Sequence, residues 1–215
     1  MKAVLASLVA IAAWSAAQTI PIEQLIHQVP ASAAREYRAT QKALENGKLP
    51  ESIAHCRKAL ETDPDNAAAH NDLGVLYLND GQVEKALDEF QKAAVLQPKM
   101  ALARVNESFA QLALDRPADA ESSARKALEI VPGDRRANLL LGWSLAAQLR
   151  FSKEALLSLR LAAREYPEAH LAAADVLIHD GSLPGARKEI EAYLASESID
   201  QKPLAEAWLR LLTIE

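Results

Sequence analysis

The stretch AAAHNDLGVLYLNDGQVEKALDEFQKAAVLQP, residues 67–98, decides the fold of the chain. Apolar side chains recur in it every three or four residues, which indicates two amphipathic helices, at residues 67–79 and 83–96. Asp80, Gly81 and Gln82 join them, and Gly81 is typical of the left-handed residue that ends a helix. Pro98 then ends the second helix. The stretch therefore predicts a helical hairpin.

This hairpin recurs along the chain with a period of about 34 residues. Prolines that end a unit are 34, 34 and 35 residues apart, and a small residue of the second helix follows the same steps: Pro64, Pro98, Pro132 and Pro167, and Ala59, Ala93, Ala127 and Ala162. A fixed period of this length indicates stacked helical units, each burying its apolar face against its neighbours. The alanines predict places where two helices cross with no room for larger side chains.

The composition agrees with a helical fold and excludes several classes of function. Of the 215 residues, 50% are hydrophobic, 25% are charged and 5% are aromatic, which favours a folded, helical chain over a disordered or all-β one. The net charge is -5 and no basic block stands out, so we expect no nucleic-acid partner. The single cysteine, Cys56, excludes an internal disulfide.

The second unit resembles the tetratricopeptide repeat. The family signature W-x2-L-G-x2-Y, A-x3-F, A and P is matched at every position but the first, by His70, Leu73, Gly74, Tyr77, Ala86, Phe90, Ala93 and Pro98. Cys56 occupies the place of Phe90 in the first unit, and we expect it to be a small core residue. In the third unit Glu107 and Ser108 replace the Leu-Gly pair.

The resemblance implies an all-α fold, a right-handed α-solenoid of about five helix-turn-helix units with a C-terminal capping helix. The units span residues 33–66, 67–100, 101–134 and 135–169, with a degenerate fifth unit at 170–200 and the capping helix at 201–215. An N-terminal segment, residues 18–32, precedes them.

Family members are typically binding scaffolds that hold a peptide on a concave surface lined by the first helix of each unit. Positions 2, 5, 9 and 12 of a first helix share one stripe. The residues expected to line the groove, called the stripe residues below, are Tyr37, Gln41, Asn71, Val75, Leu102, Val105, Phe109, Leu112, Arg136, Leu139 and Trp143. Two interpretations stay open: these residues contact a ligand, or they pack against neighbouring helices or residues 18–32. If Phe109 and Trp143 form the floor of a groove, they should be largely exposed.

A clamp for the charged tail of a chaperone, known in some family members, is not favoured. It requires basic and amide groups in three successive units. The chain has Asn106 and Arg136 at two such positions, but Asn71, Val75 and Leu140 where Lys, Asn and Arg are expected.

The residues predict no catalytic, metal or cofactor site. The histidines, His27, His55, His70, His170 and His179, are scattered, and none belongs to a His-Glu-x-x-His motif. The chain contains no Gly-x-Ser-x-Gly motif, phosphate-binding loop or dinucleotide fingerprint. We therefore expect a protein that is not an enzyme.

Residues 1–17 have the pattern of a signal peptide. Lys2, an apolar run from Ala3 to Ala13 and small residues up to Ala17 predict export with cleavage near Ala17. The run is shorter than the ~20 residues that span a bilayer, so we expect no membrane insertion after cleavage, with an uncleaved anchor as the alternative. A free thiol without a disulfide favours the bacterial periplasm or cell exterior.

Together these features predict a non-catalytic scaffold for a protein or peptide partner in the bacterial cell envelope, either periplasmic or secreted. A structural or self-assembling solenoid subunit of an envelope complex, or an accessory subunit of an enzyme, is the alternative. The residues leave the identity of the partner and the oligomeric state open.

Overall fold

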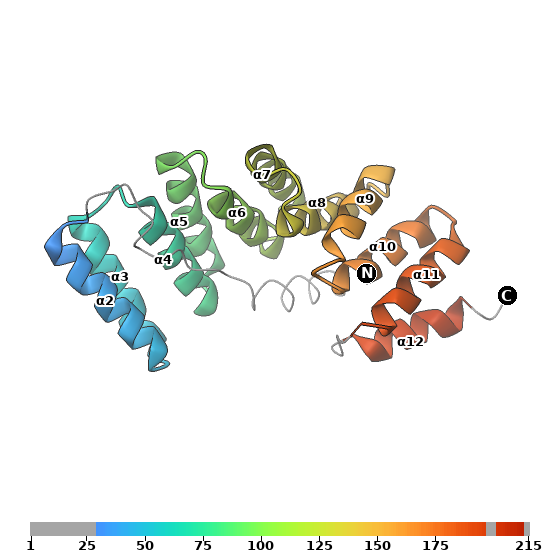
Figure 1. Ribbon diagram of the computed structural model, residues 1–215, viewed down its shortest axis with the longest axis horizontal. Helices are drawn as coiled ribbons and strands as arrows, with labels where there is room; N and C mark the ends of the chain where they lie inside the picture. The colour runs from blue at the N-terminus through green and yellow to red at the C-terminus, as the bar shows by residue number, and fades with distance from the viewer. Residues whose placement is uncertain (1–28, 197–200, 213–215) are drawn as a thin grey trace.

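The computed structural model describes residues 29–196 and 201–212, and these residues form helices joined by short turns. The helices are α2 (Ala31–Glu45), α3 (Leu49–Thr62), α4 (Ala67–Asn79), α5 (Val83–Leu96), α6 (Ala101–Ala113), α7 (Pro117–Ile130), α8 (Arg135–Ala147), α9 (Lys153–Ala162), α10 (Glu168–His179), α11 (Leu183–Leu194) and α12 (Lys202–Leu211). Within the two described ranges there is no β-strand, and the prediction of an all-α solenoid is confirmed. Hairpin pairs follow one another along an arch (Figure 1).

The helix bounds follow the sequence pattern closely. Helices α4 and α5 have the limits expected from residues 67–98. Helix α10 begins at Glu168, two residues before the expected start of the fifth unit, because Pro167 at its N-cap already has a helical φ of -54°. Helix α12 lies in the range expected for the capping helix, and packs against α11.

Short polar side chains and left-handed residues set where the helices begin and end. Asn66 and Asp134 cap α4 and α8 by accepting hydrogen bonds from the backbone N–H groups of Ala69, at 3.0 Å, and Ala137, at 2.8 Å. Gly81 ends α4 with a φ of +73°, which glycine adopts without strain. At the corresponding turn after α8, Leu149 has a φ of +58° and is 67% exposed. A left-handed leucine is strained by about 1–2 kcal/mol.

Within a pair, the two helices approach closely because a small residue on one faces a large residue on the other. A Cβ atom added at Gly74 of α4 would lie 2.5 Å from Cε1 of Phe90 on α5, and one at Gly142 of α8 would lie 2.5 Å from Cγ of Leu159 on α9. Ala93 and Ala127, expected at such crossings, are both 0% exposed.

Cys56 lies in the core between the first and second pairs, as its place in the repeat predicts. It is 1% exposed, and its Sγ atom donates a hydrogen bond to the carbonyl oxygen of Ala69 at 3.7 Å. Burial, with the nearby charges of Asp72 and Glu89, raises the pKa of the thiol to about 12. The thiol is therefore protonated and sealed.

The solenoid has two layers that differ in how closely their helices approach. The first helices of successive units contact one another, α4 with α6, α6 with α8 and α8 with α10, more closely than the second helices α5, α7 and α9 contact one another. A curved stack is concave on the side where its elements lie closer together. The first helices therefore form the inner layer of the arch in Figure 1.

Candidate peptide-binding surface

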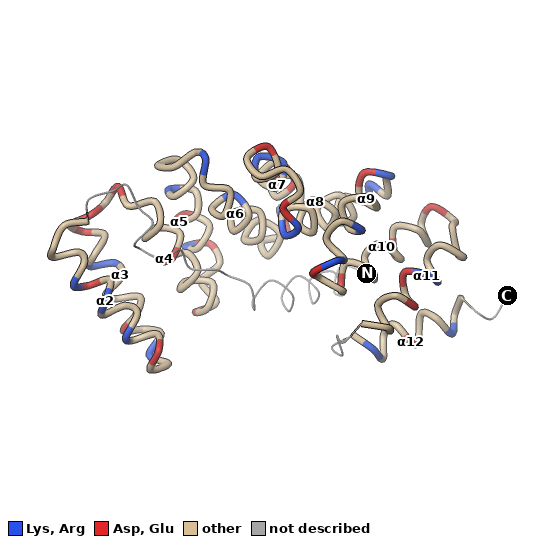
Figure 2. The backbone as a smooth tube through the Cα atoms, viewed as in Figure 1, with Lys and Arg blue, Asp and Glu red and all other residues tan. Residues whose placement is uncertain are grey.

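The inner layer carries few charges compared with the outer one. Helix α4 contains one charged side chain, Asp72, whereas α5 contains five, Glu84, Lys85, Asp88, Glu89 and Lys92. Figure 2 shows this difference between the two helices. The few charged groups on the inner layer therefore stand out against an apolar background.

The stripe residues do not share one environment. Those that are buried are Tyr37, Asn71, Val75, Val105, Phe109, Leu139 and Trp143. Leu102, Leu112 and Arg136 are partly exposed, and Gln41 is exposed. Packing against neighbouring helices therefore accounts for most of the stripe, and the partly exposed residues are the ones available to a ligand.

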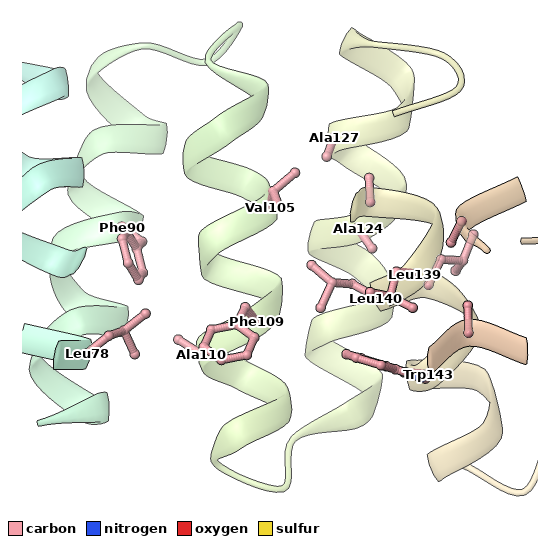
Figure 3. Packing of buried hydrophobic residues seen from close by; sticks show 14 of the residues in the cluster. Leu78, Phe90, Val105, Phe109, Ala110, Ala124, Ala127, Leu139, Leu140 and Trp143 are labelled. Atoms are coloured by element: carbon pink, nitrogen blue, oxygen red, sulfur yellow. The ribbon is translucent and has the colours of Figure 1, made fainter. Parts of the chain in front are cut away.

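The exposure expected of Phe109 and Trp143 is wrong. Phe109 is 8% exposed, Trp143 is 0% exposed, and both belong to the hydrophobic core (Figure 3). Helix α6 packs against α4, α5, α7 and α8, and helix α8 packs against α6, α7, α9 and α10. A large side chain in the middle of either helix therefore has protein on nearly every side.

Residues 18–32 are the other expected cover of the stripe. The structure describes residues 29–32 of this segment, in which Val29 packs against the hydrophobic core. Residues 18–28, like the expected signal peptide at 1–17, lie outside the described residues.

Two buried amides connect the first helices of the second and third units. The Nδ2 atom of Asn106 donates a hydrogen bond of 2.8 Å to Oδ1 of Asn71, and the side chains are 3% and 0% exposed. A buried amide that is hydrogen-bonded within the protein stabilises the packing of α4 on α6. Asn106, one of the two residues that match the charged-tail clamp, is thus engaged within the fold.

Three stripe residues line one open pocket between the third and fourth units. This pocket, called the Arg136 pocket below, has a volume of about 310 Å³ and is lined by Leu102, Val105, Asp134, Arg135, Arg136, Glu165 and Tyr166. It lies between the first turns of α6 and α8 and the loop that precedes α10. The structure therefore brings Leu102, Val105 and Arg136 together, as the stripe predicts.

The charged groups of the Arg136 pocket are paired unequally. Arg135 forms an ion pair with Glu165 at 3.2 Å, and Asp134 caps α8. Burial lowers the pKa of Arg136, although Tyr166, Asp134 and Glu165 act in the opposite direction. Burial also raises the pKa of Tyr166 to about 12. Around neutral pH the pocket therefore holds a cationic guanidinium beside an uncharged phenol.

The sequence pattern missed four residues of this pocket, Asp134, Arg135, Glu165 and Tyr166. They do not belong to the stripe, because they lie in the loops before first helices or at a helix start. Their spacing from Pro132 and Pro167 was the available signal, since the period places these loops at the same edge of the stack.

Tyr37 and Gln41 line a second, much smaller pocket, of about 50 Å³, beside Cys56 and Ala68. The hydroxyl group of Tyr37 donates a hydrogen bond to Oδ2 of Asp63 at 3.1 Å, and burial with the Asp63 charge raises the pKa of Tyr37. A water molecule occupies about 30 Å³ in the liquid, so this space holds one or two waters and no side chain of a ligand.

A third pocket lies over the second helices α3 and α5, away from the stripe. It has a volume of about 630 Å³ and is lined by Leu60, Pro64, His70, Asp88, Gln91, Lys92, Val95 and Leu96. Val95 is 74% exposed there. No residue of this pocket was expected to bind a ligand.

Three histidines of the described chain are paired with glutamates across a helix pair. His55 contacts Glu36 at 2.8 Å, and His170 contacts Glu189 at 2.7 Å. The third pair is His70 with Glu89, at 2.5 Å. Each pair joins the first and second helix of one unit.

The described residues contain no group of three or more His, Cys, Asp or Glu side chains placed to hold a metal ion. Among the helices of the same ranges, none combines the length and apolar character needed to cross a bilayer.

A family model for the tetratricopeptide repeat matches residues 37–101. No curated protein sequence matches the chain. Solved structures share its fold. The structure described as "MamA 41-end from Desulfovibrio magneticus RS-1" has a TM-score of 0.70 at 17% identity, over 80% of this chain and 100% of that chain.

Two further structures are similar along most of their length. The chain shares 21% identity and a TM-score of 0.62 with TTC0263, a protein of Thermus thermophilus, over 83% of this chain and 99% of that one. With YrrB it shares 20% identity and a TM-score of 0.68, over 85% and 92%. At these identities the likeness concerns the fold. The signature of the second unit, the family match and the stacked helix pairs show that the chain is a tetratricopeptide repeat protein.

Proposed function

We propose that the chain is a non-catalytic scaffold of the bacterial cell envelope whose inner layer binds a peptide from a partner protein. Proteins of this family are typically non-catalytic interaction scaffolds. The observation that carries the proposal is that Leu102, Val105 and Arg136 line one open pocket in the inner layer. A peptide ligand is also supported by the fold shared with YrrB, which is described as "a TPR protein with an unusual peptide-binding site".

Export to the envelope is supported by the pattern of residues 1–17. The chain isolated from its native host should begin near Gln18, and N-terminal sequencing measures this. Recovery of the full-length chain in the membrane fraction would contradict cleavage and favour an anchor.

A capture experiment tests the binding surface. Immobilised parent protein is exposed to envelope extract beside two variants, Leu102→Ser in the Arg136 pocket and Val95→Ser on the outer layer. Loss of a partner with Leu102→Ser and its retention with Val95→Ser is the expected result. Circular dichroism confirms that both variants are folded. Equal capture by all three proteins would place the binding surface elsewhere.

A structural, self-assembling role is the second candidate, and exposed apolar residues of the outer layer favour it. Val95 is 74% exposed and Leu157 is 60% exposed, on α5 and α9. If copies of the chain associate through this face, sedimentation should show an oligomer that Val95→Ser and Leu157→Ser dissociate. A monomer at all concentrations would exclude this role.

A further inference from the structure

Arg136 differs from the other arginines of the described chain that lie near acidic side chains. Those arginines are paired with carboxylates: Arg104 with Glu107, Arg116 with Asp119, Arg125 with Glu121 and Glu154, Arg135 with Glu165, Arg150 with Glu121, and Arg160 with Glu189. The structure gives Arg136 no hydrogen bond or ion pair within the described ranges, although Asp134 and Glu165 line the same pocket. The Asp134 carboxylate caps α8, and that of Glu165 holds Arg135.

An unpaired guanidinium at this place is unfavourable for folding. Arg136 is partly buried, and burial of a cation without a partner costs free energy. It also lies in the first turn of α8, where the free N–H groups of the helix form a positive end that favours anions. Two effects therefore oppose a cation here, and both become favourable once an anion binds beside it.

The pocket around Arg136 has the shape and polarity to hold one such anion with an apolar neighbour. Its volume of about 310 Å³ is bounded by Leu102 and Val105 on α6 and by Tyr166 before α10. Asp134 and Glu165 at the rim repel a phosphate, which carries about two negative charges, more strongly than a carboxylate, which carries one. The pocket thus favours a singly charged ligand.

We infer that Arg136 binds a carboxylate of the partner peptide, with an adjacent apolar side chain against Leu102 and Val105. This inference rests on the proposed function and names the chemistry that the inner layer recognises. The carboxylate comes either from the C-terminus of the peptide or from an Asp or Glu side chain. A guanidinium matches a carboxylate with two parallel N–H···O bonds, so one residue is enough to select it.

Three small probes distinguish the two sources of the carboxylate. N-acetyl-leucine has a terminal carboxylate beside an apolar side chain, N-acetyl-leucinamide has the same side chain without the charge, and the α-amide of N-acetyl-aspartic acid has only a side-chain carboxylate. Each is titrated into the full chain while the Nε–H signal of Arg136 is followed by nuclear magnetic resonance. We expect saturable shifts with one or both acids and none with the amide.

Arg135 provides a matched control because it is adjacent, has the same charge and already has a partner. Arg136→Gln should weaken binding of the acid about tenfold or more, as loss of a charge-assisted hydrogen bond does, and Arg135→Gln less than threefold. The melting temperature of Arg136→Gln should equal or exceed that of the parent, because an unpaired charge is removed. A structural role for Arg136 would lower it instead.

The inference is wrong if the amide binds as well as the acids, if both arginine variants weaken binding equally, or if inorganic phosphate binds more tightly than N-acetyl-leucine. Its failure can be separated from failure of the proposed function. Acid binding without any partner in envelope extract contradicts only the envelope scaffold. Partner capture that Arg136→Gln leaves intact contradicts only the carboxylate site.

Discussion

The second and third units hold their helix pairs together with opposite choices of side-chain size. In the second unit Gly74 allows the ring of Phe90 to lie against the backbone of α4. In the third unit Ser108 and Ala124 occupy the corresponding positions, and Ser108 Oγ donates a hydrogen bond of 2.8 Å to the carbonyl oxygen of Ala120. Both units therefore fill the space between their two helices, one with a ring and the other with a hydrogen bond.

The largest effect is expected from removing the ring. Phe90→Ala should destabilise the chain by about 3–5 kcal/mol, because Phe90 is 0% exposed and its loss leaves a cavity. Cys56→Ala, at the corresponding place of the first unit, removes fewer atoms and should cost less. Urea unfolding monitored by circular dichroism measures both. Equal losses would mean that the two positions are not equivalent.

Adding an atom on the opposite helix should have the next largest effect. Gly74→Ala should cost about 1–3 kcal/mol by overpacking against Phe90, whereas Ser108→Ala should cost about 1 kcal/mol through one lost hydrogen bond. Thermal and urea unfolding of the two variants give these values.

A transplanted pair sharpens the comparison. The double variant Gly74→Ser, Phe90→Ala reproduces the third unit in the second, so its loss of stability should be smaller than the sum of the two single losses. Strict additivity would show that the residues do not share one space.

The fold could be predicted from the sequence because its determinants are local. Asn66, Gly81 and Pro98 begin and end helices within a few residues of themselves, and the period repeats them. Exposure in the inner layer depends instead on how closely α6 and α8 approach their neighbours, and the stripe could not show that for Phe109 and Trp143.

The Arg136 pocket shows the same limit. Helical spacing identified Leu102, Val105 and Arg136, because they share one stripe. Tyr166 and Glu165 come from a loop about 30 residues further on, and their place beside Arg136 depends on how the fourth unit packs on the third.

A smaller effect, of opposite sign, is expected at the turn between the two helices of a unit. Leu149→Gly should stabilise the fourth unit by about 0.5–1 kcal/mol, because it relieves a left-handed leucine whose side chain is exposed. The reverse change in the second unit, Gly81→Leu, should destabilise the chain. Melting temperatures compare the pair, and a loss of stability with Leu149→Gly would mean that the side chain of Leu149 contributes to packing.

The smallest effect concerns pH. Burial alone would raise the pKa of Glu89, but hydrogen bonds from His70 and Lys92 outweigh it and hold the pKa below the ordinary value of 4.5. The third unit has Arg104 and Ser123 at the positions of His70 and Glu89. The stability that Glu89 contributes is present above about pH 4.5 and is lost as the pH falls through its lowered pKa.

Melting temperatures measured from about pH 6 down to pH 3 should therefore fall less steeply for Glu89→Gln than for the parent. Glu84→Gln, an exposed neighbour on α5, is the matched control and should keep the slope of the parent. A parent slope in Glu89→Gln would show that other carboxylates account for the acid sensitivity.

The buried thiol gives the chain an internal reporter of local opening. Only the thiolate reacts with disulfides and alkylating reagents, and a pKa of about 12 with 1% exposure leaves almost no reactive thiolate in the folded first pair. Cys56 therefore reacts only when α3 separates from α4. Its labelling rate reads the free energy of that single opening, while the rest of the solenoid stays folded.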